Sequence, residues 1–465
     1  MKSDTPKTGL YRRQLLHWMH DKKLFLINYP GFQRSFLLGS CKLRPETFLQ
    51  FQDDSSLFFR NRFLSCTLLV ALLFVSGKTM AQQQQVKAAG PKKEMAIPTT
   101  LKWSERMALS IMKRHPKAWQ IDNHEAPKWD YKIGMILTGY EKLYTKTKNQ
   151  KYFDYIKGYA DELIDSNGSF QNFNTQDHNI DFINAGKILF NLYDKTKDQR
   201  YFTALKTLRR QFDDHPRTAS GGFWHKKIYP NQMWLDGLYM GQPFYARYTT
   251  TFEKGEKLND VALQFELLHD HALDKKTGLF FHAWDESKQM AWANPTTGTA
   301  PHIWLRALGW YAMALVDVLD YFPKDHPKQK ELVRYLNELA AASTKFQDAS
   351  GLWYQVPNLA TKKGNYLEAS GSSMLAYAFA KGVNKGYLPS KYKDLANKAF
   401  NGLTKNLIKV DADGELHITQ VCASAGLGGN PYRDGSFEYY ISEKIKVDNS
   451  HGLGAFLLAA LELDK

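Results

Sequence analysis

Two aspartates stand at the start of predicted helices, where a carboxylate could do chemistry. Asp236 lies in the segment Trp-Leu-Asp-Gly-Leu-Tyr-Met, and Asp181 lies in His-Asn-Ile-Asp-Phe. An aspartate at a helix start most often caps the helix by accepting backbone N–H bonds, and this is the simplest interpretation of either residue alone. Two carboxylates in one cleft would instead suit acid and base catalysis on a sugar.

Further polar and aromatic residues occupy similar positions: Tyr131, His225, His282, Arg306 and Trp310. Taken alone, a residue of each of these types more often packs in the core or lies on the surface than binds a ligand. Arg306 is more suggestive, because an arginine among apolar residues needs an anion to pair with. An arginine with a histidine suits a carboxylate on a sugar, and the aromatic rings suit stacking on it. Together these residues predict a carbohydrate-active enzyme with an acidic substrate.

The elements that would position these residues are helix pairs. The segment LYTKTKNQKYF at residues 143–153 recurs as LYDKTKDQRYF at residues 192–202, which is typical of stacked helix pairs. Helices rich in glycine and alanine alternate with amphipathic ones along the chain. The predicted helices span residues 103–114, 131–147, 150–165, 181–195, 199–212, 234–248, 256–271, 304–321, 328–346, 370–381, 390–407 and 451–462.

A second repeated element is a glycine-led aromatic segment between the pairs. It occurs at residues 167–170, 220–225, 277–282, 350–355 and 413–417, and it predicts a turn followed by a short strand. Six inner and six outer helices predict an all-α fold, an (α/α)6 barrel with short β-like loops at the active-site end. The apolar last helix favours a closed ring over an open solenoid, which would need a polar cap. In such a ring the inner helix N-termini and these loops meet at one end.

Composition sets broad limits on the class of protein. The chain has 465 residues, 43% of them hydrophobic, so it can bury a large core. The net charge is +15; residues 1–81 contribute +7, from 12 basic and 5 acidic residues, which leaves +8 for the remainder. This charge permits an anionic ligand, and without a basic run or nucleic-acid motif we expect no nucleic-acid partner.

The cysteines and ligand motifs bear on metals and disulfides. Cys41 and Cys66 fall in the segment that we expect to be removed, which leaves Cys422 without a disulfide partner. The sequence contains neither CxxC nor HExxH, so we expect no metal and no cofactor.

The N-terminal part reads as a secretory signal in an unusual place. Residues 58–81 combine Arg60 and Arg62, an apolar stretch too short for a comfortable membrane span, and a small-x-small end. We therefore expect the true start to lie just before Arg60, which makes residues 1–57 a misassigned extension. We expect residues 58–81 to be a signal peptide and residues 82–100 to be a linker. The catalytic domain would be residues 101–465, secreted across the inner membrane into the periplasm without a stable membrane span. A retained membrane anchor is the alternative.

Several long motifs resemble a known family. They are SGGFWHKKIYPNQMWLDGLYMGQPF at residues 220–244, TGLFFHAWDESKQMAWAN at 277–294, WLRALGWYAMALVDVL at 304–319, and GLWYQV and YLEASGSSMLAYAFAKG within 351–382. From about Trp119 to the C-terminus the chain resembles the unsaturated rhamnogalacturonyl hydrolases, glycoside hydrolase family 105, related to family 88. The resemblance implies an (α/α)6 barrel that releases a terminal 4,5-unsaturated uronic acid from pectin-lyase products by hydrating the C4=C5 enol ether.

The resemblance also implies roles for the candidate residues. Asp236 matches the acid and base that protonates C4, and Asp181 matches a second active-site carboxylate. Tyr131, His225, His282, Arg306 and Trp310 match substrate-binding positions, with Arg306 expected on the uronate and Trp310 expected to stack on a ring. We expect a raised pKa for Asp236, because a half-buried aspartate with another carboxylate nearby disfavours its charged form.

Two other functions stay open at this point. The first is an unsaturated glucuronyl hydrolase, which would apply the same chemistry to disaccharides of the glycosaminoglycan type. The second is a non-catalytic glycan-binding barrel, which has no need for Asp181, Asp236 and Arg306 at one end. The sequence does not identify the sugar that follows the uronic acid.

Overall fold

The computed structural model describes residues 96–464, and that range is mostly helical. The expected extension, the signal peptide and residues 82–95 of the linker lie outside the described residues. Among the residues that are described, none of the helices combines the length and the apolar character needed to cross a membrane.

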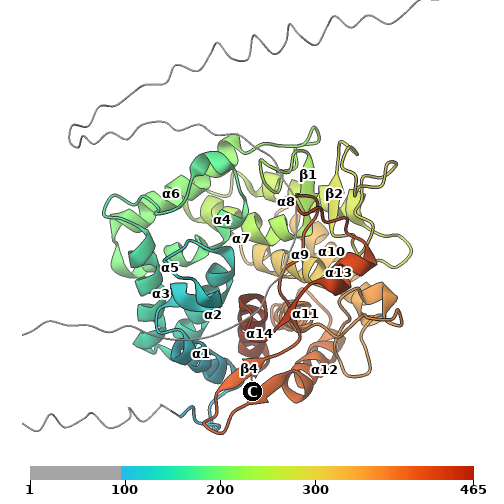
Figure 1. The fold of residues 1–465 in the computed structure, drawn as a ribbon. Helices are drawn as coiled ribbons and strands as arrows, with labels where there is room; N and C mark the ends of the chain where they lie inside the picture. Colours follow the sequence, from blue (N-terminus) through green and yellow to red (C-terminus); the bar gives the residue numbers. More distant parts are fainter. Residues whose placement is uncertain (1–95, 465) are drawn as a thin grey trace, which may run out of the picture. The chain divides into compact units, whose positions relative to one another are not determined.

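Within this range the helices form two concentric layers (Figure 1). The inner layer consists of α2 (Tyr131–Thr147), α4 (Asp181–Asn184), α5 (Lys187–Thr196), α7 (Leu235–Phe252), α9 (Leu305–Val318), α11 (Ala369–Asn384) and α14 (Ser450–Leu463). The outer layer consists of α1 (Trp103–Arg114), α3 (Gln150–Leu163), α6 (Gln199–Asp214), α8 (Leu258–Ala272), α10 (Gln329–Thr344) and α12 (Lys391–Asn406). A further short helix, α13 (Phe437–Ser442), lies in the loop before α14.

The inner layer is a closed ring. Following the chain, α2 packs on α4 and α5, α4 on α7, α7 on α9, α9 on α11 and α11 on α14, and α14 returns to pack on α2. Each outer helix covers an inner one: α3 covers α2, α6 covers α5, α8 covers α7, α10 covers α9, α12 covers α11 and α1 covers α14. The predicted (α/α)6 barrel of six inner and six outer helices is therefore confirmed.

Small residues let the inner helices approach one another closely. A Cβ atom at Gly134 of α2 would lie 2.4 Å from the Cα of Ala185, and one at Gly371 of α11 would lie 2.4 Å from the side chain of Leu305. Every residue of α9 is buried, as expected of a helix that is surrounded by other helices on all sides. The glycine and alanine content that marked these helices in the sequence thus has a direct packing reason.

The second inner helix differs from its prediction as one continuous helix over residues 181–195. It is divided into α4 and α5 at Ala185 and Gly186, where the backbone tightens into bonds between residues three apart: Gly186 N–H to Ile183 at 2.9 Å and Leu189 N–H to Gly186 at 3.1 Å. A 3₁₀-like turn of this kind narrows the helix. It does so where Ala185 lies against Gly134 of the neighbouring helix.

The glycine-led segments form turns with short antiparallel pairs, as predicted. Isolated bridges join Ile164 to Phe170, Arg217 to Phe223 and Leu273 to Phe280, and strand β3 (Ile408–Val410) pairs with β4 (Leu416–Ile418). The turn glycines have φ between 77° and 97°, a conformation that side-chain-bearing residues rarely adopt. They are Gly168, Gly221, Gly278, Gly351 and Gly414.

Two further pairs of strands tie together loops that are distant in the sequence. β1 (Gln232–Trp234) pairs with β2 (Ala283–Asp285), which links the segment before α7 to the segment before α9. β5 (Val421–Cys422) pairs with β6 (Ile445–Lys446) in the long connection before α14. These pairs hold the loops at one end of the barrel.

The close contact at Gly134 provides a test of the ring. We expect Gly134→Ala to lower the free energy of unfolding by about 1–3 kcal/mol, because the added methyl group meets backbone atoms of Ala185 that cannot rotate away. The control is Gly158→Ala on outer helix α3, where an added Cβ meets nothing within 4 Å and where alanine should raise stability by about 1 kcal/mol. Urea unfolding measures both, and an equal response of the two variants would contradict the tight packing.

Candidate active site

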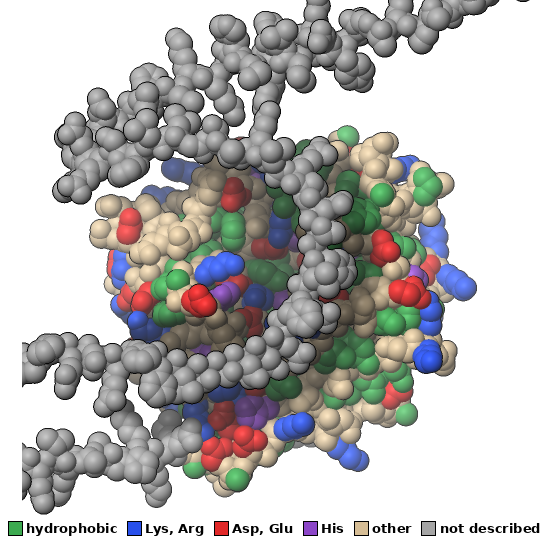
Figure 2. Space-filling view, in the orientation of Figure 1, with side chains coloured by type: hydrophobic (Ala, Val, Ile, Leu, Met, Phe, Trp, Pro, Cys, Tyr) green, Lys and Arg blue, Asp and Glu red, His purple; other side chains and the backbone are tan. Residues whose placement is uncertain are grey.

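The first turns of the inner helices meet at one end of the ring. Tyr131 begins α2, Asp181 begins α4, and Asp236, Arg306 and His451 are the second residues of α7, α9 and α14. The Tyr131 hydroxyl lies 2.9 Å from Nε2 of His451, which joins the first inner helix to the last. In the space-filling view, histidine, acidic and basic side chains gather toward the hollowed middle of the face drawn (Figure 2).

Asp236 contacts a buried imidazole. Its Oδ2 lies 3.2 Å from Nε2 of His282, and Nδ1 of His282 lies 2.7 Å from the Tyr440 hydroxyl. The β1–β2 pair makes this contact possible, because the backbone N–H of Leu235 donates to the carbonyl of His282. The His282 side chain has no exposed surface, whereas that of Asp236 is 14% exposed. Asp236 is therefore the member of this group that a ligand can reach.

Asp181 contacts two cationic or potentially cationic groups. Its Oδ2 lies 2.7 Å from Nζ of Lys226, and its Oδ1 lies 3.4 Å from Nε2 of His225. The His225 ring stacks on Trp234, with centroids 4.7 Å apart and planes 6° from parallel. A Cβ atom at Gly237 would lie 3.0 Å from Nδ1 of His225, so this glycine leaves room for the imidazole against α7.

Neither carboxylate is the cap of its helix. The N-cap residues are Ile180 for α4 and Trp234 for α7, and neither of them caps through its side chain. Asp130 does act as a cap, since its Oδ1 accepts from the backbone N–H of Lys132 at 2.8 Å. The capping interpretation thus applies to Asp130, and the carboxylates of Asp181 and Asp236 have other partners.

The pKa of Asp236 differs from the expectation of a raised value. Burial raises this pKa, but the contact with His282 and the charges of His282 and His225 outweigh burial, so that the pKa lies below its usual value. Burial also lowers the pKa of His225, to about 4, which makes His225 neutral near pH 7 and leaves His282 as the main partner of Asp236. Burial and a second carboxylate would raise the pKa of Asp236, but the imidazole of His282, 3.2 Å away, lowers it, and no local sequence pattern indicates this contact.

Arg306 is already paired within the protein. Its Nε donates to the Ser370 hydroxyl at 2.8 Å, and its guanidinium lies 3.5 Å from Glu368 and donates to the backbone carbonyl of Cys422. The side chain is 1% exposed. The anion that a buried arginine requires is thus Glu368, and the geometry gives Arg306 the role of holding the loop before α14 against α9 and α11.

Trp310 lies within the packed interior. Its side chain is 1% exposed, and its ring stacks on Tyr239 with centroids 4.9 Å apart. This geometry does not fit the expected stacking on a sugar, because the ring already packs within the core. Trp234 is the tryptophan beside the two histidines: its ring stacks on those of His225 and Tyr229, and its centroid lies 5.3 Å from that of His282. It is 6% exposed.

Several further residues contribute to the site without having been predicted from the sequence. Lys226 directly follows His225, and its position next to a candidate in a glycine-led loop is a signal that could have identified it. His451 marked only the start of a helix in the sequence. Tyr440 and Glu368 come from loops whose proximity depends on the tertiary fold, so no local pattern indicates them. Among residues 96–464 the structure contains no cluster of His, Cys, Asp and Glu suited to a metal ion.

A closed ring of helix pairs with two carboxylates and two imidazoles at one end is the fold and site of a glycosidase built on a helical barrel. The family model described as Glycosyl Hydrolase Family 88 matches residues 103–465, and the chain belongs to this family. A solved structure of a family 105 glycoside hydrolase from C. acetobutylicum is 45% identical, with a TM-score of 0.75, over 78% of this chain and 99% of that one. This protein is a glycosidase of the family 88 and 105 group.

Two other relatives extend the comparison. The unsaturated rhamnogalacturonyl hydrolase YesR of Bacillus subtilis is 28% identical over 270 residues, which are 57% of this chain and 73% of that protein. The unsaturated glucuronyl hydrolase of Bacillus sp. GL1 is 13% identical, with a TM-score of 0.57 over 77% of this chain and 94% of that one. The second likeness concerns the fold alone.

The buried histidine beside Asp181 predicts a dependence of stability on pH. The unfolded pKa of His225 is about 6.5 and the folded one is about 4, so the unfolded chain binds more protons between these values. The contribution of His225 to the free energy of unfolding is therefore fully present above pH 6.5, and it is lost as the pH falls toward 4. The free energy of unfolding of the wild type should fall as the pH is lowered through this range. We expect the fall to be smaller in His225→Gln, by about 1 kcal/mol per pH unit.

Urea unfolding at pH 7 and pH 5 measures this change. His215, whose pKa burial also lowers to about 4, contributes in the same direction and should keep part of the dependence in the variant. The control is His271→Gln, at an exposed histidine. If the wild type and His225→Gln lost equal stability between pH 7 and pH 5, the proposed neutral burial of His225 would be wrong.

Proposed function

We propose that this glycosidase releases a terminal 4,5-unsaturated uronic acid from rhamnogalacturonan oligosaccharides that pectin lyases produce. The observation that carries the proposal is the presence of two carboxylates at the convergent end of the barrel. Asp236 contacts His282, and Asp181 contacts Lys226. The name of the Bacillus subtilis relative supports the substrate class. The glucuronyl hydrolase activity on glycosaminoglycan disaccharides is the alternative substrate.

The chemistry is the hydration of an enol ether. Asp236 gives a proton to C4, which places positive charge on C5 and the ring oxygen, and water then adds at C5. The water loses its proton to the Asp236 carboxylate, which restores the acid. The resulting hemiketal opens at the bond between C5 and the ring oxygen, and the hemiacetal left at C1 expels the reducing-side sugar. Asp181 and Lys226 would orient the sugar hydroxyls or the water.

An acid with a lowered pKa must gain its proton when the substrate binds. In the free protein Asp236 has a pKa below its usual value, for which its contact with His282 is the main lowering cause. The carboxylate of a bound uronic acid would add a negative charge close to Asp236 and would exclude water, and both effects raise the pKa of a carboxyl group. We therefore assign the acid form of Asp236 to the complex with substrate.

Lys226 is the cation that we assign to the uronate. It remains 23% exposed while it contacts Asp181, whereas Arg306 is 1% exposed and paired with Glu368. Burial lowers the pKa of Lys226, but the contact with Asp181, together with the nearby Tyr229 and Asp236, raises this pKa above its usual value, which keeps the side chain charged. Tyr131 and His225 complete the proposed binding surface, and Trp234 flanks it. An export signal at residues 58–81 would place the enzyme in the periplasm.

Loss of Asp236 tests the function directly. We expect Asp236→Asn to reduce kcat/KM by about 10²–10⁴-fold, because the amide cannot protonate C4. Loss of ultraviolet absorbance at the conjugated C=C, with a pectin-derived unsaturated disaccharide, measures the rate. Asp270→Asn, at a side chain that is 67% exposed, is the matched control. A variant with near wild-type turnover would overturn the role of Asp236, and consumption of only a hyaluronan-derived disaccharide would favour the alternative substrate.

Neighbouring lysines test the uronate contact. We expect Lys226→Met to raise KM by at least about ten-fold with a smaller change in kcat, since a charge-assisted hydrogen bond to the substrate is worth about 1.5–3 kcal/mol. Lys227→Met is the control, because Lys227 is exposed and its Nζ donates to the carbonyl of Gln176 at 3.4 Å. Equal KM values for the two variants would exclude Lys226 from uronate binding.

A further inference from the structure

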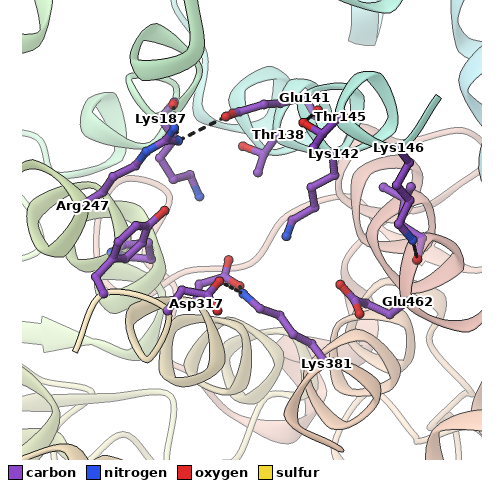
Figure 3. Close-up of a pocket in the computed structure, with 14 residues that line it drawn as sticks. Thr138, Glu141, Lys142, Thr145, Lys146, Lys187, Arg247, Asp317, Lys381 and Glu462 are labelled. Carbon is purple, nitrogen blue, oxygen red and sulfur yellow. Dashed lines mark hydrogen bonds and ion pairs between the residues drawn. The ribbon is translucent and has the colours of Figure 1, made fainter. Parts of the chain in front are cut away.

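A cavity lies at the end of the inner helices opposite the glycosidase site. It has a volume of about 390 Å³ and is lined by residues of α2, α5, α7, α9, α11 and α14. Polar lining residues include Glu141, Lys142, Lys187, Arg247, Asp317 and Lys381 (Figure 3). None of these residues belongs to the glycosidase site, which is formed by the first turns of α2, α4, α7, α9 and α14.

The acidic groups of this cavity have partners within the protein. Asp317 accepts from Nζ of Lys381 at 2.6 Å and from the Tyr377 hydroxyl at 2.7 Å. Glu141 lies 3.2 Å from Arg247, and Glu462 accepts from the Asn384 amide at 2.9 Å. The negative charges of the lining are thus engaged.

Two lysines of the cavity do not have such partners. Lys187 is 5% exposed, and its Nζ makes no hydrogen bond; the ammonium lies 3.7 Å from the centroid of the Tyr239 ring. Among the described residues, Lys142 forms neither an ion pair nor a hydrogen bond, and its Nζ lies 5.8 Å from the centroid of the Tyr377 ring. Contacts with aromatic faces attract a cation, but they leave the N–H donors unsatisfied. Both side chains point toward the middle of the cavity in Figure 3.

Neutralising the carbonyl ends of helices does not account for both lysines. Cations are favoured near helix C-termini, and Lys146, which donates to the Leu461 carbonyl, fits that explanation. Lys187, however, is the first residue of α5. Acidic Asp317 and Glu462 also lie near the ends of their helices, where that effect disfavours negative charge. Buried N–H donors without partners are uncommon in folded proteins, and they point to a ligand.

We propose that this cavity binds a compact oxyanion, such as inorganic phosphate or a small dicarboxylate, between Lys142 and Lys187. Oxygen atoms of such an anion can accept hydrogen bonds from both ammonium groups. The described residues provide no such acceptor for either lysine. Burial, together with the charges of Lys142 and Lys381, lowers the pKa of Lys187 to about 7 against the opposing effect of Asp317 and Glu141. An anion beside it would favour the charged ammonium. The site is separate from the proposed hydrolysis, and its occupation would stabilise the barrel by mass action.

Titration calorimetry with the full chain tests the site. Phosphate and malonate are the two probes, each titrated at constant ionic strength in chloride buffer so that general screening cancels. We expect saturable binding of at least one probe, weakened about ten-fold or more in Lys187→Met and in Lys142→Met, because each loses a charged hydrogen bond to the anion. Lys330→Met, at an exposed lysine of α10, should bind as the wild type does.

Hydrolysis of the unsaturated disaccharide is measured on the same variants. We expect both cavity variants to keep wild-type turnover, which shows that they fold and separates this result from any failure of the proposed function. If Lys187→Met does not fold, Lys142→Met, whose side chain is only partly buried, carries the test. No saturable binding of either probe to the wild type, or equal binding by folded wild-type and cavity variants, would overturn the proposal.

Discussion

Close packing of the inner helices is the constraint on which the rest of the structure depends. Where Gly134 meets Ala185, and where Gly371 meets Leu305, even one methyl group would collide with its neighbour. This packing lets seven helical segments close into a ring. Because the ring is closed, the first turns of α2, α4, α7, α9 and α14 come together at one end. Later turns of the ring, together with the start of α5, come together at the other end. Both proposed sites follow from this single feature.

Burial in so tight a ring makes every polar group in it depend on a partner. Arg306 and Glu368 are each almost fully buried and satisfy one another together with Ser370. A buried pair of this kind is strongly destabilised by loss of one partner, since the other charge then remains in the interior. The same requirement explains Asp317 with Lys381 at the opposite end. Nζ of Lys187 lacks such a partner, and this is the position where we propose that an anion binds.

At the catalytic end the groups that keep partial exposure are the ones suited to meet substrate. Asp236 and Lys226 retain some surface, and their partners His282 and Asp181 hold them in place. The imidazole of His282 is in turn held by Tyr440. This arrangement keeps Asp236 ionised in the free protein, so its acid function depends on the charge and the exclusion of water that a bound uronate brings.

The sequence by itself determined the helices, their pairing and the positions of Asp181 and Asp236, because period, small residues and glycine-led turns are local signals. The predicted bounds of α1 and α2 agree with the structure, and the tight turn at Gly186 does not follow from periodicity. Tertiary structure alone decided which charges meet. The β1–β2 pair places His282 against Asp236, and this contact lowers the pKa of Asp236, which we expected from the sequence to be raised. Glu368, 62 residues beyond Arg306, pairs with the guanidinium that we expected to bind the substrate carboxylate. Electrostatic interactions act through space, so their partners become known only when the chain has folded.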